Sequence, residues 1–264
     1  MTDTGTVRGS NEDNFLIDAE LGLFGIADGM GGHARGEIAS ADGLTAMAYY
    51  LRTALASPGR QPLPNFRPSP FKPTPAQAGA SPGPETLQAL VTLHDAVEFT
   101  NQRMFQTNVD NRRGNGDGMG TTLSGLWRPG PGLPLLVFHV GDTRVYRFRD
   151  GKLTLLTHDQ TMYQQALDAG LLQNLPTRNL LLQAIGPASA VSPDLKAWLA
   201  ESDDVYLLCS DGLHGASLDD RIAAVLEVTL EHGLAECCAQ LIEAAKLDGS
   251  RDNITVLLLQ LASS

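Results

Sequence analysis

The sequence predicts an α+β fold, a four-layer α-β-β-α sandwich in which helices flank two stacked, mostly antiparallel sheets. Short apolar runs follow one another with brief turns between them, and helical patterns occur in pairs. The pattern lacks the strand–helix–strand alternation of a parallel sheet. The chain has 264 residues, 42% of them hydrophobic, so it can bury such a core without disulfides.

The expected strands are apolar runs bounded by turn residues, and Asp150-Gly151 predicts a tight hairpin turn between two of them. Such short connections join antiparallel neighbours, because parallel strands need a long crossover. The strands are expected at residues 14–18, 21–27, 121–127, 133–140, 143–149, 153–156, 195–199, 205–210 and 254–261.

The expected helices have periodic apolar patterns, at residues 36–55, 85–108, 161–169, 218–228 and 234–247. Between the first two, residues 57–84 hold nine of the 15 prolines. Proline fixes φ and lacks an amide donor, so we expect a surface insertion there. Its composition favours a tolerated linker, with a partner-docking segment as the alternative.

Charge and composition exclude several classes of protein. The 19 Lys+Arg against 30 Asp+Glu give a net charge of −11, which disfavours nucleic-acid binding. The polar residues 1–5 lack the basic region of a signal peptide, and no apolar stretch reaches the roughly 18 residues of a membrane span. Cys209, Cys237 and Cys238 form neither a disulfide framework nor a zinc motif. We therefore expect a cytoplasmic protein that binds no membrane.

Four aspartates flank expected strands beside glycine or asparagine. They stand in Ala27-Asp28-Gly29, Val140-Gly141-Asp142, Ser210-Asp211-Gly212 and Arg251-Asp252-Asn253. Carboxylates at strand ends can converge at one edge of a sheet, where hard cations such as Mg²⁺ and Mn²⁺ take oxygen ligands. The glycine after Asp28 lets a backbone carbonyl approach as a further ligand. Each pair taken alone is also ordinary turn chemistry, so that interpretation stays open.

Two other phosphate chemistries fit the sequence poorly. Residues 29–34 match the dinucleotide fingerprint G-x-G-x-x-A, but Asp28 directly before them would repel a pyrophosphate, and the chain lacks the βαβ pattern. None of the three cysteines precedes a phosphate loop ending in arginine, which disfavours a cysteine phosphatase.

Six motifs occur in order along nearly the whole chain outside the proline-rich insertion. They are residues 2–13 (TDTGTVRGSNED), 25–33 (GIADGMGGH), 118–123 (GMGTTL), 139–144 (HVGDTR), 207–213 (LLCSDGL) and 252–256 (DNITV). Together they resemble the bacterial branch of the type 2C (PPM) metal-dependent protein serine/threonine phosphatases. In the fourth motif, Thr143 stands where serine is usual.

The resemblance implies a binuclear metal site held by three aspartates. Asp28 would bridge two Mn²⁺ or Mg²⁺ ions, with Gly29 adding its carbonyl, and Asp211 and Asp252 would complete the pair. Arg8 would hold the substrate phosphate. Asp117 and Asp142 would hold a third, more weakly bound ion. The residues that would support the metal ligands from behind are Glu12, Asp13, His33 and Asn253. Asp159 lies where a further acidic residue often stands in the family.

Asp28, Arg8 and Asp13 would be the catalytic residues, since Asp13 would orient metal-bound water. In the eukaryotic branch a histidine follows two residues after the bridging aspartate, but here that residue is Met30. Protonation of the leaving group then falls to a metal-bound water or to His33.

The resemblance implies one catalytic domain over residues 1–264, with a flap at about 162–186, in a monomer that hydrolyses phosphoserine and phosphothreonine on proteins. A water bridging two ions would attack phosphorus, and the enzyme would oppose a bacterial Ser/Thr kinase. Two alternatives stay open: a phosphopeptide-binding module without turnover, and a two-metal hydrolase of small phosphates. The intact aspartates argue against the first.

Overall fold

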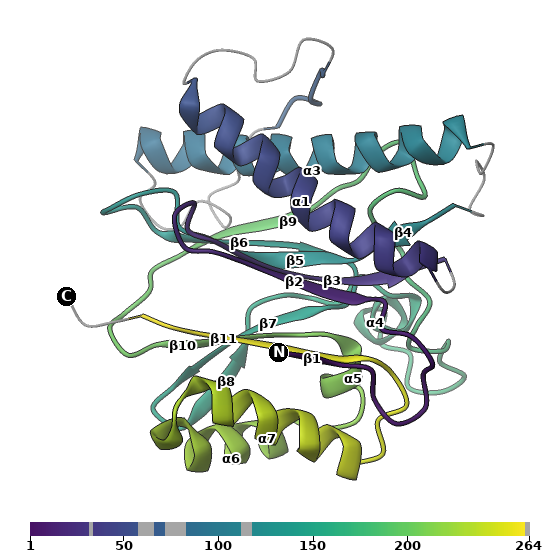
Figure 1. The fold of residues 1–264 in the computed structure, drawn as a ribbon, viewed down its shortest axis with the longest axis vertical. Coiled ribbons are helices and arrows are strands. Elements are labelled where there is room, and N and C mark those ends of the chain that lie inside the picture. The colour runs from purple at the N-terminus through teal and green to yellow at the C-terminus, as the bar shows by residue number, and fades with distance from the viewer. Residues whose placement is uncertain (32–33, 58–65, 72–82, 112–117, 262–264) are drawn as a thin grey trace.

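Two antiparallel sheets lie face to face in the computed structural model, which describes residues 1–31, 34–57, 66–71, 83–111 and 118–261 (Figure 1). Within those residues, the larger sheet has the strand order β2-β3-β5-β6-β9, with β4 paired to β3. Its strands are β2 (Asp13–Asp18), β3 (Leu23–Met30), β4 (Gly120–Thr121), β5 (Leu123–Trp127), β6 (Leu135–Val140) and β9 (Asp194–Trp198).

The smaller sheet has the order β1-β11-β10-β7-β8. Asp150 and Gly151 turn the β7–β8 hairpin with positive φ values of 50° and 73°, as a type I′ turn requires. The tight turn expected at this pair is therefore present. The strands of this sheet are β1 (Thr2–Asp3), β7 (Arg144–Arg149), β8 (Lys152–Leu155), β10 (Val205–Cys209) and β11 (Ile254–Gln260).

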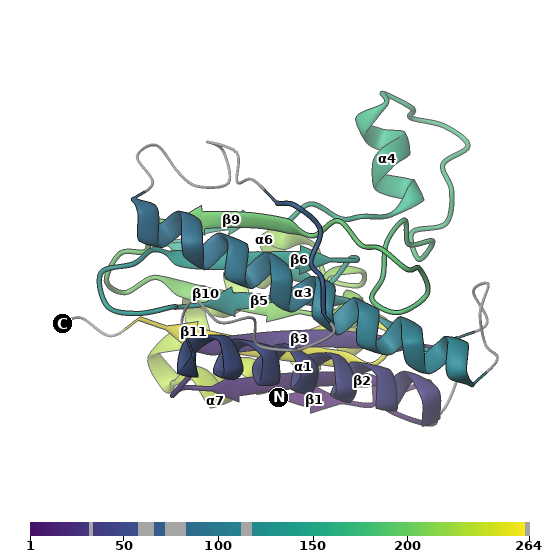
Figure 2. The same ribbon diagram turned by 90° about the horizontal axis from the view of Figure 1, so that it is seen from above.

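Helices cover the outer face of each sheet, so the molecule has four layers (Figure 1). The helices over the larger sheet are α1 (Ala34–Ala56) and α3 (Pro84–Asp110), and those over the smaller sheet are α6 (Asp219–Thr229), η1 (Leu230–His232) and α7 (Leu234–Leu247). The short helix α5 (Asp211–His214) directly follows β10. Figure 2 shows that α4 (Met162–Asp168) stands away from the sandwich.

Apolar side chains fill all three spaces between the layers. Ile26 and Tyr206 are fully buried between the two sheets. Leu93 of α3 is buried against the larger sheet, and Leu241 of α7 against the smaller one. Burying such a side chain stabilises the fold by about 1.5–3 kcal/mol. The predicted four-layer sandwich is thus confirmed.

Some predicted boundaries were wrong. β3 continues past Ala27 to Met30 because Gly29 and Met30 pair with Thr121 and Gly120 of β4. The strand therefore runs three residues beyond the end expected at residue 27. The short elements β1, β4, α5 and η1 were not predicted, because two to four residues are too few to show a periodic pattern.

The proline-rich insertion expected at residues 57–84 falls mostly outside the described residues, which include only 66–71 and the ends. Phe66 is buried, and its ring meets that of Tyr50 edge-on at 5.6 Å between centroids. The expected flap at 162–186 contains α4 and then an extended segment with isolated bridges at Leu181 and Ile185. None of the helices in the described ranges is long and apolar enough to cross a membrane.

Candidate metal centre

Asp13 and Asp28 are the first acidic pair that the fold brings together. They are directly opposite each other in the antiparallel β2–β3 pair, which places their side chains on the same face of the sheet. Asp13 is buried, and its Oδ2 accepts a hydrogen bond of 2.7 Å from Ser210 Oγ at the end of β10. This carboxylate therefore links the two sheets.

The backbone around Asp28 is tightly fixed. Its amide donates to Thr122 Oγ1 at 2.8 Å, and its carbonyl accepts from the Thr122 amide at 2.9 Å. The next amide, of Gly29, donates to the Glu12 carbonyl at 3.1 Å. A Cβ at Gly29 would lie only 2.0 Å from the Gly36 carbonyl oxygen. Only glycine fits here, because the chain segments approach so closely.

Asp211 is the first residue of α5 and follows β10 directly. Its Oδ1 is buried, and within the described part of the chain no hydrogen-bond donor reaches it. A buried carboxylate oxygen without a partner is costly, unless a cation compensates its charge. This atom is therefore a candidate ligand for a positive ion.

Asp142 and Asp252 approach the same place from two further loops. Asp142 is buried after β6, and its carbonyl accepts from His214 Nε2 at 2.9 Å. Asp252, just before β11, accepts from Arg8 Nη2 at 2.6 Å. Arg8, predicted to hold the substrate phosphate, is 56% exposed and here neutralises a predicted metal ligand.

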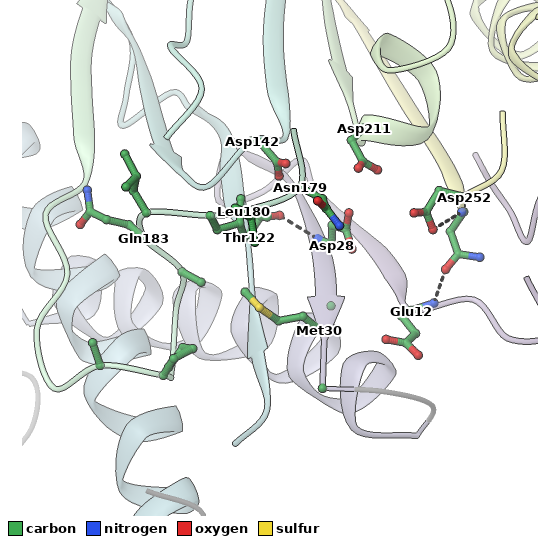
Figure 3. A pocket seen from close by; sticks show the side chains of 18 of the residues that line it. Glu12, Asp28, Met30, Thr122, Asp142, Asn179, Leu180, Gln183, Asp211 and Asp252 are labelled. Atoms are coloured by element: carbon green, nitrogen blue, oxygen red, sulfur yellow. Dashed lines mark hydrogen bonds between the residues drawn. The ribbon is translucent and has the colours of Figure 1, made fainter. Parts of the chain in front are cut away.

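Four of these carboxylates, those of Asp28, Asp142, Asp211 and Asp252, line one pocket of about 900 Å³ (Figure 3), whereas Asp13 is not part of the lining. Another part of the lining is formed by residues between 179 and 191, after α4. In Figure 3, Gln183 lies far from the carboxylates. The acidic residues of the lining are Glu12, Asp28, Asp142, Asp211 and Asp252.

Burial and mutual repulsion raise the pKa values of the acidic side chains. Burial raises the pKa of Asp28 well above its ordinary value, and the charges of Asp13 and Asp211 raise it further. Burial also raises the pKa of Asp211 to about 8, of Asp142 to about 7 and of Asp13 to about 6. A bound cation would displace these protons, since metal binding favours the ionised carboxylate.

The donor set fits a hard divalent cation. All the acidic groups offer oxygen, and no histidine or cysteine is among the described lining residues, which is the preference of Mg²⁺ and Mn²⁺ rather than of zinc. In the described ranges, no three acidic, histidine or cysteine side chains stand close enough together to hold a metal ion without moving. An ion would therefore have to draw these carboxylates together and replace Arg8 as the partner of Asp252.

Asn253 ties the N-terminal segment to this centre. Its Oδ1 accepts from the Glu12 amide, and its Nδ2 donates to the carbonyls of Thr4 and Ser10, each at 2.9 Å. The side chain is buried. It therefore fixes both ends of the loop that carries Arg8.

Two predicted site residues, Asp117 and His33, lie outside the described residues. Asp159 is held by a bidentate pair with Arg144, whose Nε and Nη2 each donate at 2.8 Å. This ion pair lowers the pKa of Asp159 against the effect of its burial. Asp159 is therefore engaged by Arg144 in this structure.

Sequence reasoning missed three residues that support the centre: Thr122, Ser210 and His214. Thr122 and Ser210 lie within recognised motifs, yet their roles depend on contacts with strands remote in sequence. His214 had no signal, because its partner is a backbone carbonyl 72 residues away.

The pKa shifts predict that the metal-free chain loses stability between pH 6.5 and 8.5. Asp142 and Asp211 have raised pKa values, so the folded chain binds more protons than the unfolded chain there, and stability falls with pH. Below this range, the buried His139 and His214, with lowered pKa values, act in the opposite direction. We expect the melting temperature in EDTA to fall by about 5 °C.

Saturating Mn²⁺ should remove most of this dependence on pH, and Asp211→Asn should reduce it in EDTA. A metal-free melting temperature that stays constant or rises from pH 6.5 to 8.5 would contradict the prediction.

Replacing Asn253 with alanine should destabilise the chain by about 2–3 kcal/mol, because the Glu12 amide and two carbonyls lose their partner. We expect the melting temperature to fall by about 5 °C. Asn111→Ala is the control, since Asn111 is exposed and its side-chain amide donates, among the described residues, to the Thr107 carbonyl of its own helix. Equal shifts in the two variants would show that Asn253 has no special role.

The chain resembles characterised proteins over nearly its whole length. It is 33% identical over 262 residues to the serine/threonine protein phosphatase PstP of Mycobacterium tuberculosis, covering 97% of this chain but 43% of that protein. The chain thus spans less than half of this relative. No protein-family model matches the sequence.

Two solved structures share the fold. The crystal structure of the Mycobacterium tuberculosis serine/threonine phosphatase PstP/Ppp matches with a TM-score of 0.77 and 32% identity, covering all of this chain and 97% of that one. The catalytic domain of PstP in complex with two manganese ions matches with a TM-score of 0.75 and 31% identity, covering 100% and 96%.

Proposed function

The chain belongs to the bacterial type 2C (PPM) family of metal-dependent serine/threonine phosphatases, and from this premise we propose that it hydrolyses phosphoserine and phosphothreonine in proteins. The observation that carries the proposal is the pocket lined by carboxylates from both sheets, in which Asp211 Oδ1 is buried and receives no hydrogen bond from the described residues. Residues 1–264 would act as one catalytic domain.

Two divalent ions, Mn²⁺ or Mg²⁺, would be held by Asp28, Asp211 and Asp252 with the Gly29 carbonyl. The PstP catalytic domain with two manganese ions supports this number. Asp142 lies in the same pocket and, with Asp117, would hold a third, weaker ion. When bound, the ions neutralise phosphate charge and make water a stronger nucleophile.

The residues of this chain position the reactants. Arg8 lines the pocket and is 56% exposed, and it would leave Asp252 to bind the phosphate by charge-assisted hydrogen bonds. Asp13, fixed by Ser210, and Glu12, fixed by Asn253, would orient water around the ions. Thr122 holds the backbone of Asp28 in place through two hydrogen bonds.

A covalent cysteine route is not available in this pocket. Cys209, Cys237 and Cys238 are buried and absent from its lining. Histidine, lysine and tyrosine are also absent from the described lining residues. In this proposal a water therefore protonates the leaving oxygen, with His33 as the alternative donor.

The test is turnover of a phosphothreonine peptide with Mn²⁺ and after EDTA treatment. We expect metal-dependent release of phosphate from the peptide. Binding of the peptide without turnover would favour a phosphopeptide-binding module. Rapid turnover of small phosphate metabolites alone would favour a metabolite hydrolase.

The remaining parts of the proposal concern partners. A phosphatase of protein phosphoserine and phosphothreonine opposes a Ser/Thr kinase, and autophosphorylated bacterial kinase is the natural protein substrate to add to the assay. We also propose a monomer, which light scattering of the metal-loaded chain would check.

A further inference from the structure

We propose that residues 179–191, which we name the flap wall, form a subsite for an aliphatic side chain next to the phosphorylated residue of the substrate. This inference rests on the proposed function, because it concerns the same pocket. It specifies the phosphoproteins that the site prefers, which have an aliphatic residue rather than an acidic one beside the phosphorylated residue.

The two sides of the pocket differ in chemistry. Every charged residue in the described lining, including Arg8, lies on the side that carries the carboxylates. The flap wall contributes mainly aliphatic side chains: Leu180, Leu182, Ala184, Pro187 and Val191. Leu180 and Leu182 are 46% and 44% exposed, so their side chains are available to a ligand.

Gln183, a polar side chain of the flap wall that lines the pocket, is already engaged in hydrogen bonds. Gln183 Oε1 accepts from the Ser192 amide at 2.7 Å, and its Nε2 donates to the Ser192 carbonyl at 3.2 Å. Figure 3 shows Gln183 far from the carboxylates. Asn179 also lines the pocket, and the other lining residues of the wall offer mainly apolar surface.

Backbone hydrogen bonds hold the flap wall in place. The Leu182 amide donates to the Gln160 carbonyl at 2.7 Å, and the Leu180 carbonyl accepts from the Met162 amide at 2.8 Å. Further along, Ile185 and Thr121 exchange two bonds of 2.9 and 3.1 Å. An ordered apolar wall can discriminate between side chains, because the ligand need not pay to order it.

Gln160 also ties the flap wall to the carboxylates. Its amide donates to the Gly141 carbonyl at 2.8 Å, and its Oε1 accepts from the Gly141 amide at 3.0 Å. Gly141 directly precedes Asp142. The wall therefore keeps a fixed position relative to the place where the phosphate would bind.

This arrangement selects by both attraction and repulsion. When the phosphate reaches the carboxylate side, the residues next to it in the peptide lie against the flap wall, since both sides belong to one pocket. An aliphatic side chain there removes apolar surface from water. An acidic side chain finds no cation on the wall and faces a chain with a net charge of −11.

The experiment measures binding and turnover separately. The probes are non-hydrolysable phosphonate analogues of one phosphothreonine peptide. Leu, Ser or Glu is placed, one position at a time, at the two residues before and the two residues after the phosphothreonine mimic. Their Kd values are measured by fluorescence anisotropy on the Mn²⁺-loaded chain. At one or more positions we expect the Leu peptide to bind about tenfold more tightly than the Glu peptide.

A charge substitution on the flap wall makes the test independent of folding defects. Leu182→Lys should abolish or reverse the preference for Leu over Glu at the peptide position where the unmodified chain shows it. The Glu peptide should then bind as tightly as the Leu peptide or more tightly. Leu172→Ser is the matched control, because Leu172 is 83% exposed in the same segment but outside the pocket lining. It should keep the wild-type preference.

Equal Kd values for all peptides, or an unchanged preference in Leu182→Lys, would overturn the inference. The proposed function is tested by a different result, the Mn²⁺-dependent turnover of p-nitrophenyl phosphate and phosphothreonine peptide by the unmodified chain. A chain that discriminates in binding but shows no turnover would retain the subsite and lose the catalytic proposal.

Discussion

Replacing Asp28 with asparagine should lower kcat/KM for a phosphothreonine peptide by about 10³-fold or more in the presence of Mn²⁺. Asparagine keeps the size of the side chain but removes the charge that would bridge two cations. The backbone contacts with Thr122 do not involve the carboxylate, so the local fold should persist. Steady-state kinetics would measure the loss of kcat/KM, and calorimetric titration with Mn²⁺ would measure the loss of metal binding.

The same substitution should stabilise the metal-free chain. The pKa of Asp28 is raised by burial and by the charges of Asp13 and Asp211, so asparagine removes the free-energy cost of burying this carboxylate, charged or protonated, at pH 8. We expect a higher melting temperature in EDTA at pH 8 together with the loss of activity. Asp110→Asn is the control, because Asp110 is exposed at the end of α3.

Unchanged turnover in Asp28→Asn would refute the bridging role. Loss of turnover together with a lowered melting temperature would instead indicate a structural defect. It would contradict the predicted stabilisation of the metal-free chain.

Replacing Gly29 with alanine should destabilise the chain by about 3 kcal/mol or more. The added Cβ would lie 2.0 Å from the Gly36 carbonyl oxygen and 2.7 Å from that of Glu12. Both neighbours are backbone atoms, so β3 or the start of α1 has to move. The melting temperature should fall by about 6–12 °C, and Mn²⁺ affinity should fall because Asp28 and the Gly29 carbonyl move together.

Gly130→Ala provides the matched control for this substitution. A Cβ at Gly130 would meet only the Leu133 side chain, at 4.0 Å, and the backbone there needs no positive φ. Equal melting temperatures for the Gly29→Ala and Gly130→Ala variants would show that the close approach seen in the structure has no energetic consequence.

Long elements of the fold were predictable because their patterns are periodic and local. The range expected for the last helix, residues 234–247, matches α7 (Leu234–Leu247), and the Asp150-Gly151 turn has the positive φ values that its residues favour. The end of β3 was not predictable. It depends on pairing with β4, about 90 residues later in the chain, and a window of sequence does not contain that partner.

The candidate site likewise has residues that the local sequence predicts and contacts that it does not predict. Glycine and aspartate motifs indicated Asp28, Asp211 and Asp252 because their chemistry is local: short acidic side chains at strand ends, beside residues that permit tight turns. The opposition of Asp13 and Asp28, the Ser210 hydrogen bond between sheets and the Arg8–Asp252 ion pair join residues that are far apart in the chain.

The sequence by itself determined the family, the layer order and the acidic residues of the candidate centre. Only the tertiary structure decided which carboxylate oxygen lacks a partner, which glycine cannot accept a Cβ, and that an apolar wall faces the acids across one pocket. The physical reason is that desolvation, repulsion and steric contact act between atoms close in space, whatever their separation along the chain.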